Sequence, residues 1–486
     1  MVVRHIATYM AAHAVSACLG FAAIIVYTRL LSPAEYGLYT IGMSTAGILA
    51  AVFFAWVRNA VLRFESEGGS VDVRRTGLVC FALSALALPL ALGGIVLMLD
   101  LPAHQAVAAG CFAIAISFFE LNQEILRARL RPMFYLIGGV LRASLALCFG
   151  TIAVFWTESG LALLFAVSLA YLCAVLALAF KTWEYPVARF NGQACREFAK
   201  FGAPFAISSL VFALSAALDR LLVVTLLGHE AAGHYGASAD FVRQIILIPA
   251  ISISAAAFPI AFRTFAQDGE EAAIKHLEKS AELFFATMIP AVTGFAIVSD
   301  HIAAIVFGQE FRAEATELMP VIAFAAFLAA ISQFYFHIGF HITKRTYLAL
   351  IQETVMLIAG LALMVPLIRT FGLEGAAGAR VATEAIGCLV CLIVVRRIFR
   401  LPLIPLRLMR IAPAVGFMAF VTLWMESLLP AGEPLTLVST VLAGIASYAF
   451  AVYVFDICGA RRIRPLSRLA DAHQIVMRLA ASGKSA

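Results

Sequence analysis

The sequence predicts an all-α polytopic membrane protein with about fourteen transmembrane helices. Of its 486 residues, 63% are hydrophobic and 13% are charged, whereas about a quarter of the residues in a soluble domain are charged. The mean hydropathy is +0.95. Apolar stretches of about 20 residues, the length that spans a bilayer, are centred near residues 20, 50, 88, 115, 146, 170, 215, 248, 290, 328, 358, 387, 420 and 445.

A short motif occurs twice in the same hydropathic context. Leu30-Leu31-x5-Gly37-x-Tyr39 recurs 196 residues later as Leu226-Leu227-x5-Gly233-x-Tyr235, and each copy lies between two apolar stretches. We therefore predict two six-helix lobes related by a pseudo-two-fold repeat, with two extra helices at the C-terminus. Because six is an even number, both lobes share one orientation, and a substrate pathway is expected at their interface.

The elements follow in order from this repeat. Residues 1–180 form an N-lobe with transmembrane helices 1–6, and residues 181–201 form a basic cytoplasmic linker that suits a short interfacial helix. Residues 202–398 form a C-lobe with helices 7–12. Helices 13 and 14 occupy residues 399–456, and residues 457–486 form an amphipathic tail on the cytoplasmic surface.

Basic residues are concentrated in every second connection between the spans. The positive-inside rule then places both termini in the cytoplasm. The net charge of +6 reflects these loops, which face anionic lipid, and no nucleic acid is implied. The nine cysteines suggest no disulfide framework, and no metal ligands are predicted. The basic connections lie around residues 63–75, 127–131, 181–200, 263–279, 344–345 and 396–410.

The short connections argue against an enzyme. No loop exceeds about 20 residues, which leaves no room for a nucleotide-binding or glycosyltransferase domain. The P-loop, zinc-protease and nucleophile-elbow motifs are also missing from the sequence. We predict no catalytic residues and no cofactor.

Charged side chains inside the predicted spans mark the candidate site, because they are costly in lipid and face the bundle interior. In the first half these are Arg58, Glu120, Glu124 and Arg142. Glu120 and Glu124 are one turn apart on one helix face, an arrangement that a proton-coupled carrier would use. Glu120 and Arg142 have similar depth on neighbouring helices, which would allow an ion pair between them.

A second set flanks the turn near residue 231. Asp219 and Arg220 end one span, while Asp240 and Arg243 begin the next. At a rise of about 1.5 Å per residue all four lie at a similar depth, so the sequence predicts Asp219 paired with Arg243 or Arg220 paired with Asp240. Such pairs could instead be a structural lock between two helices.

The remaining intramembrane charges are Glu353, and Arg380 with Glu384 one turn later. Arginines suit an anionic cargo, because guanidinium binds phosphate in a bidentate manner. The acids are candidates for ion coupling or for a salt-bridge gate. The predicted substrate-binding residues are Arg58, Arg142, Arg220, Arg243 and Arg380, and the predicted coupling or gate residues are Glu120, Glu124, Asp219, Asp240 and Glu353.

Several runs resemble one transporter family. They are Thr28-Arg29-Leu30-Leu31-Ser32-Pro33-Ala34-Glu35-Tyr36-Gly37-Leu38-Tyr39, Phe198-x-x-Phe201-Gly202-x-Pro204, Asp219-Arg220-Leu221-Leu222, and Phe371-Gly372-Leu373-Glu374-Gly375-Ala376-Ala377. Their order and spacing, across residues 1 to about 398, resemble those of the Wzx-type polysaccharide-biosynthesis flippases. These belong to the multidrug/oligosaccharidyl-lipid/polysaccharide exporter superfamily, which has the MATE-like fold.

The resemblance implies a multi-pass protein of the bacterial inner membrane that flips undecaprenyl-pyrophosphate-linked oligosaccharide to the periplasmic leaflet by alternating access. Such transport serves O-antigen, lipopolysaccharide or exopolysaccharide synthesis. It implies a cationic central cavity, a proton or sodium gradient as driving force, and polymerase or export proteins of the pathway as partners.

Three other functions remain as alternatives at this point. A cation-coupled exporter of small molecules or drugs would have an acidic or aromatic cavity poor in arginine. A peptidoglycan-precursor flippase would share the fold and the headgroup of the cargo. A membrane polymerase or ligase would need a large periplasmic loop, and the sequence has none.

Overall fold

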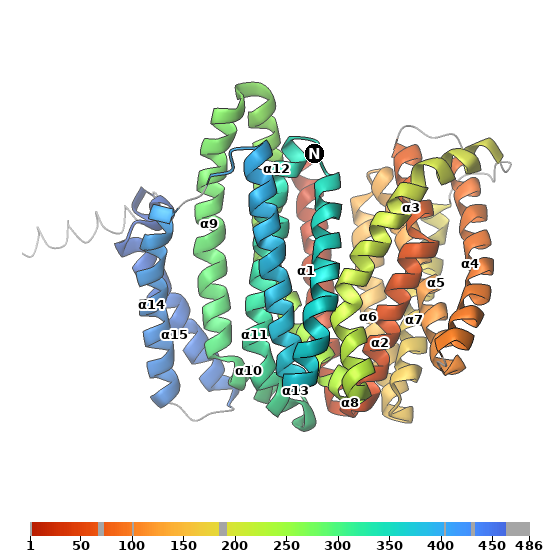
Figure 1. Ribbon diagram of the computed structural model, residues 1–486, viewed down its shortest axis with the longest axis horizontal. Coiled ribbons are helices and arrows are strands. Elements are labelled where there is room, and N and C mark those ends of the chain that lie inside the picture. The colour runs from red at the N-terminus through yellow and green to blue at the C-terminus, as the bar shows by residue number, and fades with distance from the viewer. Residues whose placement is uncertain are drawn as a thin grey trace, which may run out of the picture. The chain divides into compact units, whose positions relative to one another are not determined.

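The computed structural model describes residues 2–66, 72–99, 102–183, 192–402, 405–428 and 433–462, and these are almost wholly helical (Figure 1). Short 3₁₀ turns and one π-helical turn, Ser332–Phe336, separate some helices. The helices are α1 (Val2–Leu30), α2 (Pro33–Phe53), α3 (Ala55–Ser66), α4 (Asp72–Leu99), α5 (Ala103–Ala128), α6 (Pro132–Thr157), α7 (Gly160–Thr182), α8 (Gly192–Asp268), α9 (Glu270–Ile297), α10 (Ser299–Val306), α11 (Arg312–Ile331), α12 (His337–Ile342), α13 (Tyr347–Ile398), α14 (Pro405–Leu428) and α15 (Pro434–Val454).

Eleven helical segments of the described chain are long and apolar enough to cross a membrane. Two of them, α8 with 77 residues and α13 with 52, are too long for a single crossing. Each breaks at a glycine with positive φ, 89° at Gly228 and 60° at Gly372, a conformation that only glycine adopts without strain. Each arm of α8 and α13 corresponds to one predicted span, and the shorter apolar stretch Ala14–Leu30 corresponds to the first. Every predicted span therefore has a helical counterpart.

The two arms of α13 run antiparallel. Gly360 on the first arm faces Thr383 on the second, and Gly387 lies against Met356 and Gln352. These contacts are symmetric about Gly372, so the glycine is the turn of a helical hairpin. In α8, Arg220 and Asp240 form an ion pair across Gly228, so this glycine is likewise the turn between two helical arms.

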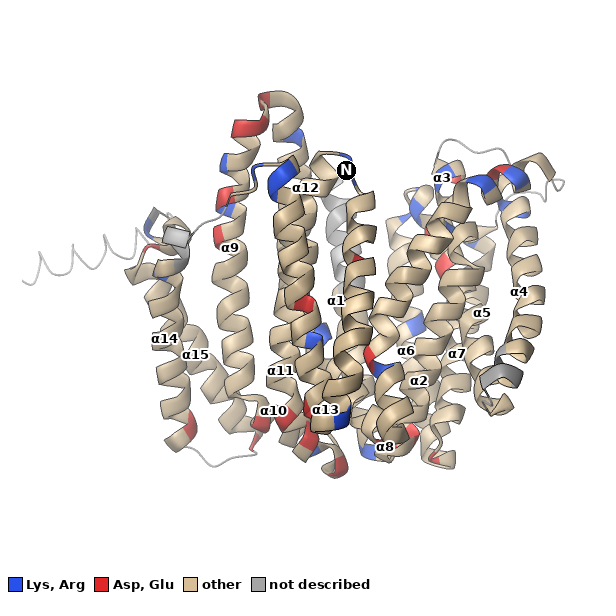
Figure 2. Ribbon diagram, in the orientation of Figure 1, with Lys and Arg blue, Asp and Glu red and all other residues tan. Residues whose placement is uncertain are grey.

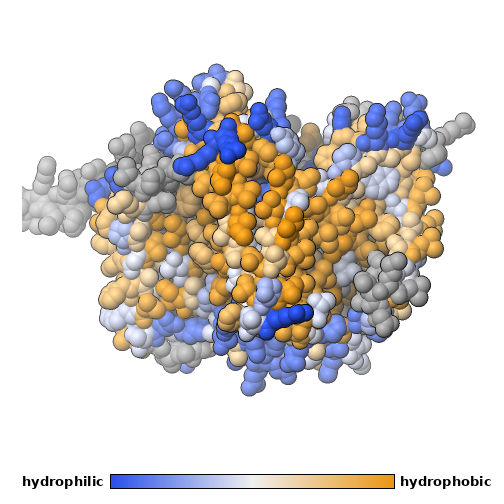
Figure 3. Space-filling model, in the orientation of Figure 1, coloured by the Kyte–Doolittle hydropathy of each residue, from blue (hydrophilic) through white to orange (hydrophobic). Residues whose placement is uncertain are grey.

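The surface and the charges agree with a bilayer environment. On the face in Figure 3, apolar side chains cover the middle of the helices and hydrophilic ones gather at the helix ends. Lys, Arg, Asp and Glu are likewise concentrated near the ends (Figure 2), and few lie in the middle of a span. The protein is therefore a multi-pass membrane protein.

The contacts divide the chain into two compact units whose boundaries fall inside α8, α10, α11 and α13 and immediately before α13. Unit 1 comprises Met1–Gln244, Val306–Ile322 and Tyr347–Gly387, and unit 2 comprises Ile245–Ile305, Ala323–Thr346 and Cys388–Ala486. In unit 1, α1 packs on α6, α6 on α7, and α5 on α2, α3 and α7. In unit 2, α14 packs on α9 and α15, around an apolar core that includes Ile411, Ala414 and Ala451.

Part of the predicted linker and most of the predicted tail lie outside the described residues. Helix α8 begins at Gly192, whereas the C-lobe was predicted to begin at residue 202. The helix therefore starts about ten residues earlier than expected. Residues 463–486 of the amphipathic tail are not described. The two-lobe division stays a prediction.

The repeated motif brings two backbones together. A Cβ atom on Gly37 would collide with the carbonyl oxygen of His229, and one on Gly233 would collide with the carbonyl oxygen of Pro33. These two contacts are equivalent under the 196-residue offset, as in a two-fold interface, where each partner makes the same contact. The reason for glycine at both positions is that no side chain fits between the helices.

The turn before Gly37 also forms a hydrogen bond with the start of α7. Ser32 caps α2 by accepting a hydrogen bond from the Glu35 backbone N–H at 3.4 Å, and Pro33 occupies the first helical turn. The Glu35 carboxylate accepts a hydrogen bond from the Gly160 backbone N–H, at 2.7 Å, at the start of α7. The motif Ser32 to Gly37 is thus a joint between α2 and two other segments of unit 1.

Replacing Gly37 or Gly233 with alanine should separate the two helices and destabilise the protein by about 1–3 kcal/mol, the usual cost of overpacking. The thermal unfolding midpoint of the purified protein in detergent measures the effect. Gly47 is the matched control, because it lies on the same α2 helix and no atom lies within 4 Å of the place that a Cβ would take. Gly47→Ala should therefore be neutral or slightly stabilising. Equal midpoints for Gly37→Ala and Gly47→Ala would contradict the close contact.

Candidate functional site

The charged residues of the first set line one cavity in unit 1. It has a volume of about 420 Å³ and is enclosed by side chains of α1, α3, α5, α6 and α7. Arg58 comes from α3, Glu120 and Glu124 from α5, and Arg142 from α6. Glu120 and Glu124 therefore share a helix face, as predicted, and that face points into the cavity.

The ion pair that the sequence allowed between Glu120 and Arg142 does not form. Glu120 instead pairs with Arg58, and Arg142 donates a hydrogen bond of 2.7 Å to the Tyr171 hydroxyl. The Arg142 guanidinium also lies over two aromatic rings, 5.0 Å from the centroid of Tyr171 and 5.8 Å from that of Phe119. These cation–π contacts keep the Arg142 guanidinium beside the aromatic rings. The Glu120 carboxylate forms its ion pair with Arg58 instead.

A second cavity of about 290 Å³ adjoins the first. Ser16, Arg142 and Tyr171 line both. Arg220 and Asp240 lie in the wall of the second cavity. The two charge sets that looked separate in the sequence are therefore joined, with Arg142 and Tyr171 at the junction.

Four tyrosines in these walls were not among the predicted site residues. Tyr27, Tyr36, Tyr39 and Tyr171 line the second cavity. Each offers an apolar ring face and a polar hydroxyl, and the Tyr27 hydroxyl donates to the Ala146 carbonyl at 2.7 Å. Tyr36 and Tyr39 stand in or beside the repeated motif, and this was the sequence signal that could have identified them.

The two arms of α8 are joined by charges. Arg220 pairs with Asp240, which confirms one of the two predicted cross-hairpin pairs. Asp219 does not pair with Arg243. It accepts a hydrogen bond of 3.0 Å from the Tyr235 hydroxyl and lies 3.8 Å from the Arg380 guanidinium.

Arg380 fastens α13 to α8. It donates to Glu384 at 2.6 Å and to the Ser215 carbonyl at 3.3 Å. The Glu384 side chain is only 2% exposed, and Glu353 is buried beside Ser215. These contacts join α13 to α8, and a buried carboxylate that loses its partner is left uncompensated. The predicted roles of Arg380 in substrate binding and of Glu353 in ion coupling stay predictions.

Arg243 differs from the other four predicted arginines. Its side chain is exposed, and it has no ion pair or hydrogen bond with any residue that the structure describes. It lies within electrostatic range of both Arg220 and Arg380. It also lies within electrostatic range of the carboxylates of Asp219, Asp240 and Glu353, with none of which it forms an ion pair.

The sequence matches a known family. A family model described as "Polysaccharide biosynthesis protein" matches residues 26–316, more than half of the chain. The chain belongs to this family. It is 24% identical over 368 residues to a protein of Shigella flexneri named as an O-antigen transporter, and the alignment covers 72% of this chain and 87% of that relative.

Two solved structures establish the fold of this polysaccharide biosynthesis protein. The lipid II flippase MurJ, in an inward closed conformation, aligns with a TM-score of 0.72 at 14% identity, over 92% of this chain and 98% of that one. A multidrug resistance MATE family transporter in its inward-facing conformation gives 0.64 at 14% identity, over 79% and 94%. The MATE-like, all-α membrane fold expected from the sequence is confirmed.

The described contacts predict opposite effects of two arginine substitutions on stability. Arg380→Ala should cost about 3–5 kcal/mol, because Glu384 and Asp219 lose a buried partner. Arg243→Ala should change stability by no more than about 0.5 kcal/mol, as for an exposed residue without partners. Thermal unfolding midpoints of the two variants in the same detergent give the comparison, and a large loss in Arg243→Ala would show that Arg243 is structural.

Proposed function

We propose that this protein is a flippase for undecaprenyl-pyrophosphate-linked oligosaccharide repeat units. It moves them from the cytoplasmic to the periplasmic leaflet of the bacterial inner membrane by alternating access, for O-antigen or exopolysaccharide synthesis. Support comes from the family, from the relative named as an O-antigen transporter, and from the fold shared with a lipid flippase.

One observation carries the proposal. The two adjoining cavities of unit 1 are lined by arginines and tyrosines together with three carboxylates, those of Glu120, Glu124 and Asp240. Arg142, Arg220 and Tyr171 lie in helices that are long and apolar enough to cross a membrane. A pyrophosphate headgroup needs guanidinium donors, while a glycan needs hydroxyl partners and ring faces. A chain of arginine and tyrosine side chains through the bundle meets both needs.

The arginines divide into two roles. Arg142 lines both cavities and forms no ion pair with a described carboxylate, so it is one anchor for the pyrophosphate. Arg243, which forms no ion pair among the described residues and lies within electrostatic range of Arg220, is the second. Arg58 and Arg220 are held by Glu120 and Asp240. When a proton or a sodium ion neutralises either carboxylate, the guanidinium is released to bind the headgroup, and this exchange couples the ion gradient to transport.

The rival functions fit these cavities less well. An exporter of organic cations would have to place a positive cargo beside Arg142, whose guanidinium forms no ion pair with a described carboxylate and would repel it. Chemistry by an enzyme is not part of the proposal, since relatives by sequence and by fold are transporters. A peptidoglycan-precursor flippase would bind the same headgroup and differs only in the glycan.

The proposed topology follows the charges. Both termini lie in the cytoplasm, on the side of the basic connections. Residues 1–180 and 202–398 are the two lobes, and helices 13 and 14 are an addition beyond the repeat. Polymerase and export proteins of the same pathway receive the flipped glycan.

The first test is the distribution of undecaprenyl-linked oligosaccharide between the leaflets in cells with and without the protein. Loss of the protein should trap the complete lipid-linked repeat in the cytoplasmic leaflet and abolish surface glycan. Re-expression of the chain should restore the periplasmic pool. An unchanged distribution in the deleted strain would remove this cargo and favour the peptidoglycan precursor.

Arg243→Ala should lower the rate of transport about 10- to 100-fold, because a hydrogen bond to a charged group contributes about 1.5–3 kcal/mol. The readout is periplasmic glycan per folded protein in the membrane. Arg369→Ala is the matched control, since Arg369 is also an exposed arginine of unit 1, on α13. If Arg243→Ala and Arg369→Ala transport equally well, Arg243 is not an anchor.

A further inference from the structure

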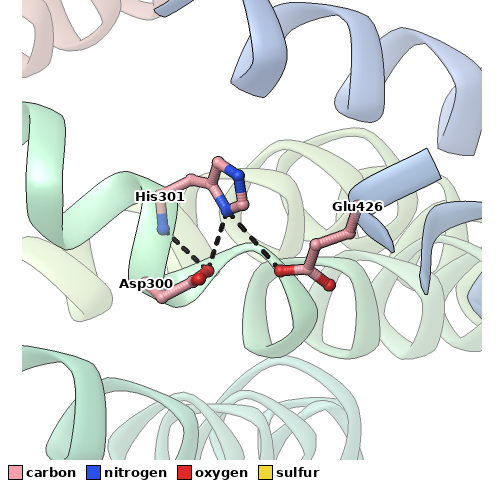
Figure 4. A group of neighbouring side chains, drawn as sticks. All are labelled: Asp300, His301 and Glu426. Atoms are coloured by element: carbon pink, nitrogen blue, oxygen red, sulfur yellow. Dashed lines mark hydrogen bonds and ion pairs between the residues drawn. The ribbon is translucent and has the colours of Figure 1, made fainter. Parts of the chain in front are cut away.

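A cluster of three ligating side chains lies in unit 2, away from the cavities described above. Asp300 and His301 stand at the start of α10, and Glu426 stands in the last turn of α14 (Figure 4). His301 Nδ1 lies 2.9 Å from Asp300 Oδ1 and 3.5 Å from Glu426 Oε1. One ligating atom from each of the three lies within 4.8 Å of the other two.

The charge of this cluster is not balanced by protein groups. Neither carboxylate has a Lys or Arg partner among the residues that the structure describes. A protonated imidazole compensates one carboxylate at most, which leaves the other negative at the end of a membrane helix. A divalent cation compensates both and removes their mutual repulsion.

The cluster is held in place on one side and open on the other. The His301 side chain is 2% exposed, while those of Glu426 and Asp300 are 23% and 46% exposed. The His301 backbone N–H donates to Asp300 Oδ1 at 2.7 Å and fixes that carboxylate. His301 Nε2 is buried without a hydrogen-bond partner, so all polar contacts of the ring converge at Nδ1, and water can reach the cluster from the Asp300 side.

The spacing fits a small cation. Zinc binds imidazole nitrogen and carboxylate oxygen at about 2.0–2.2 Å in tetrahedral geometry, which separates neighbouring ligand atoms by roughly 3.4 Å. The distance of 3.5 Å between His301 Nδ1 and Glu426 Oε1 is close to this separation. The shorter distance to Asp300 is that of a hydrogen bond, whose proton the ion would displace.

We propose that Asp300, His301 and Glu426 bind a divalent cation of the zinc type, with water from the open side completing its coordination. His301 and Glu426 are 125 positions apart in the chain, so the ion fastens the end of α14 to the start of α10. It reinforces the packing of α14 on α9 and the hydrogen bond of 2.5 Å from the Tyr448 hydroxyl to the Ala286 carbonyl on α9. Its role is structural, because it joins α14, one of the additional helices beyond the predicted repeat, to α10 within the predicted C-lobe.

Equilibrium dialysis of the purified full-length protein, without a polyhistidine tag, against zinc ions tests the proposal. The wild type should bind one zinc per chain at this site, and zinc should raise its thermal unfolding midpoint. His301→Gln, Glu426→Gln and Asp300→Asn should each weaken zinc binding at least tenfold and abolish the rise. Asp300 is the most exposed of the three, so Asp300→Asn tests the site even where the buried substitution disturbs folding.

His104→Gln and Glu433→Gln serve as matched controls. Both residues are exposed and stand beside the start of a helix, and neither belongs to the cluster. Each control variant should keep the wild-type affinity and stoichiometry. Absence of stoichiometric zinc in the wild type, or binding by all three cluster variants at wild-type affinity, would overturn the proposal and leave a triad held by hydrogen bonds alone.

Discussion

The close approach of Gly37 and Gly233 is the constraint on which the candidate site of unit 1 depends. With no side chain between them, α2 and the second arm of α8 meet backbone to backbone. This contact carries Tyr36 on one helix and Asp240 on the other into the wall of one cavity. A larger residue at either glycine would widen the gap and separate the tyrosines of the first motif from the charges that follow the second. The two copies of the motif therefore determine how these helices pack, and that packing places the residues that line the cavity.

Electrostatics inside the bundle then decides what each charge can do. A charge in a span is costly unless a partner or a wet cavity compensates it. Arg380 lies among Glu384, Asp219 and a backbone carbonyl, and its contacts join helices. The carboxylates of Glu120 and Asp240, which pair with Arg58 and Arg220, are more exposed than those around Arg380, and both pairs line cavities. Under the proposed function, these are the pairs that exchange partners during transport.

In unit 2 the charged side chains described above lie outside the apolar core. Its core between α9, α14 and α15 is apolar, and its polar cluster lies at the helix ends. The cation proposed there would hold an added helix pair that the repeat does not stabilise. In the proposed function the charges of unit 1 exchange partners, whereas in the proposed cation site those of unit 2 attach one helix to another.

Local sequence was sufficient to predict the helices and one of the ion pairs. Span length and hydropathy identified the helices, because in lipid the backbone must satisfy its own hydrogen bonds, and equal depth across one tight turn predicted Arg220 with Asp240. Partners on separate helices depend instead on how the bundle packs. Arg58 and Glu120 are 62 positions apart, the cation–π contacts of Arg142 depend on how α5, α6 and α7 rotate, and Glu426 meets His301 only after α14 docks. Helical periodicity fixes the face on which a residue lies, but the packing of whole helices decides which other face it meets.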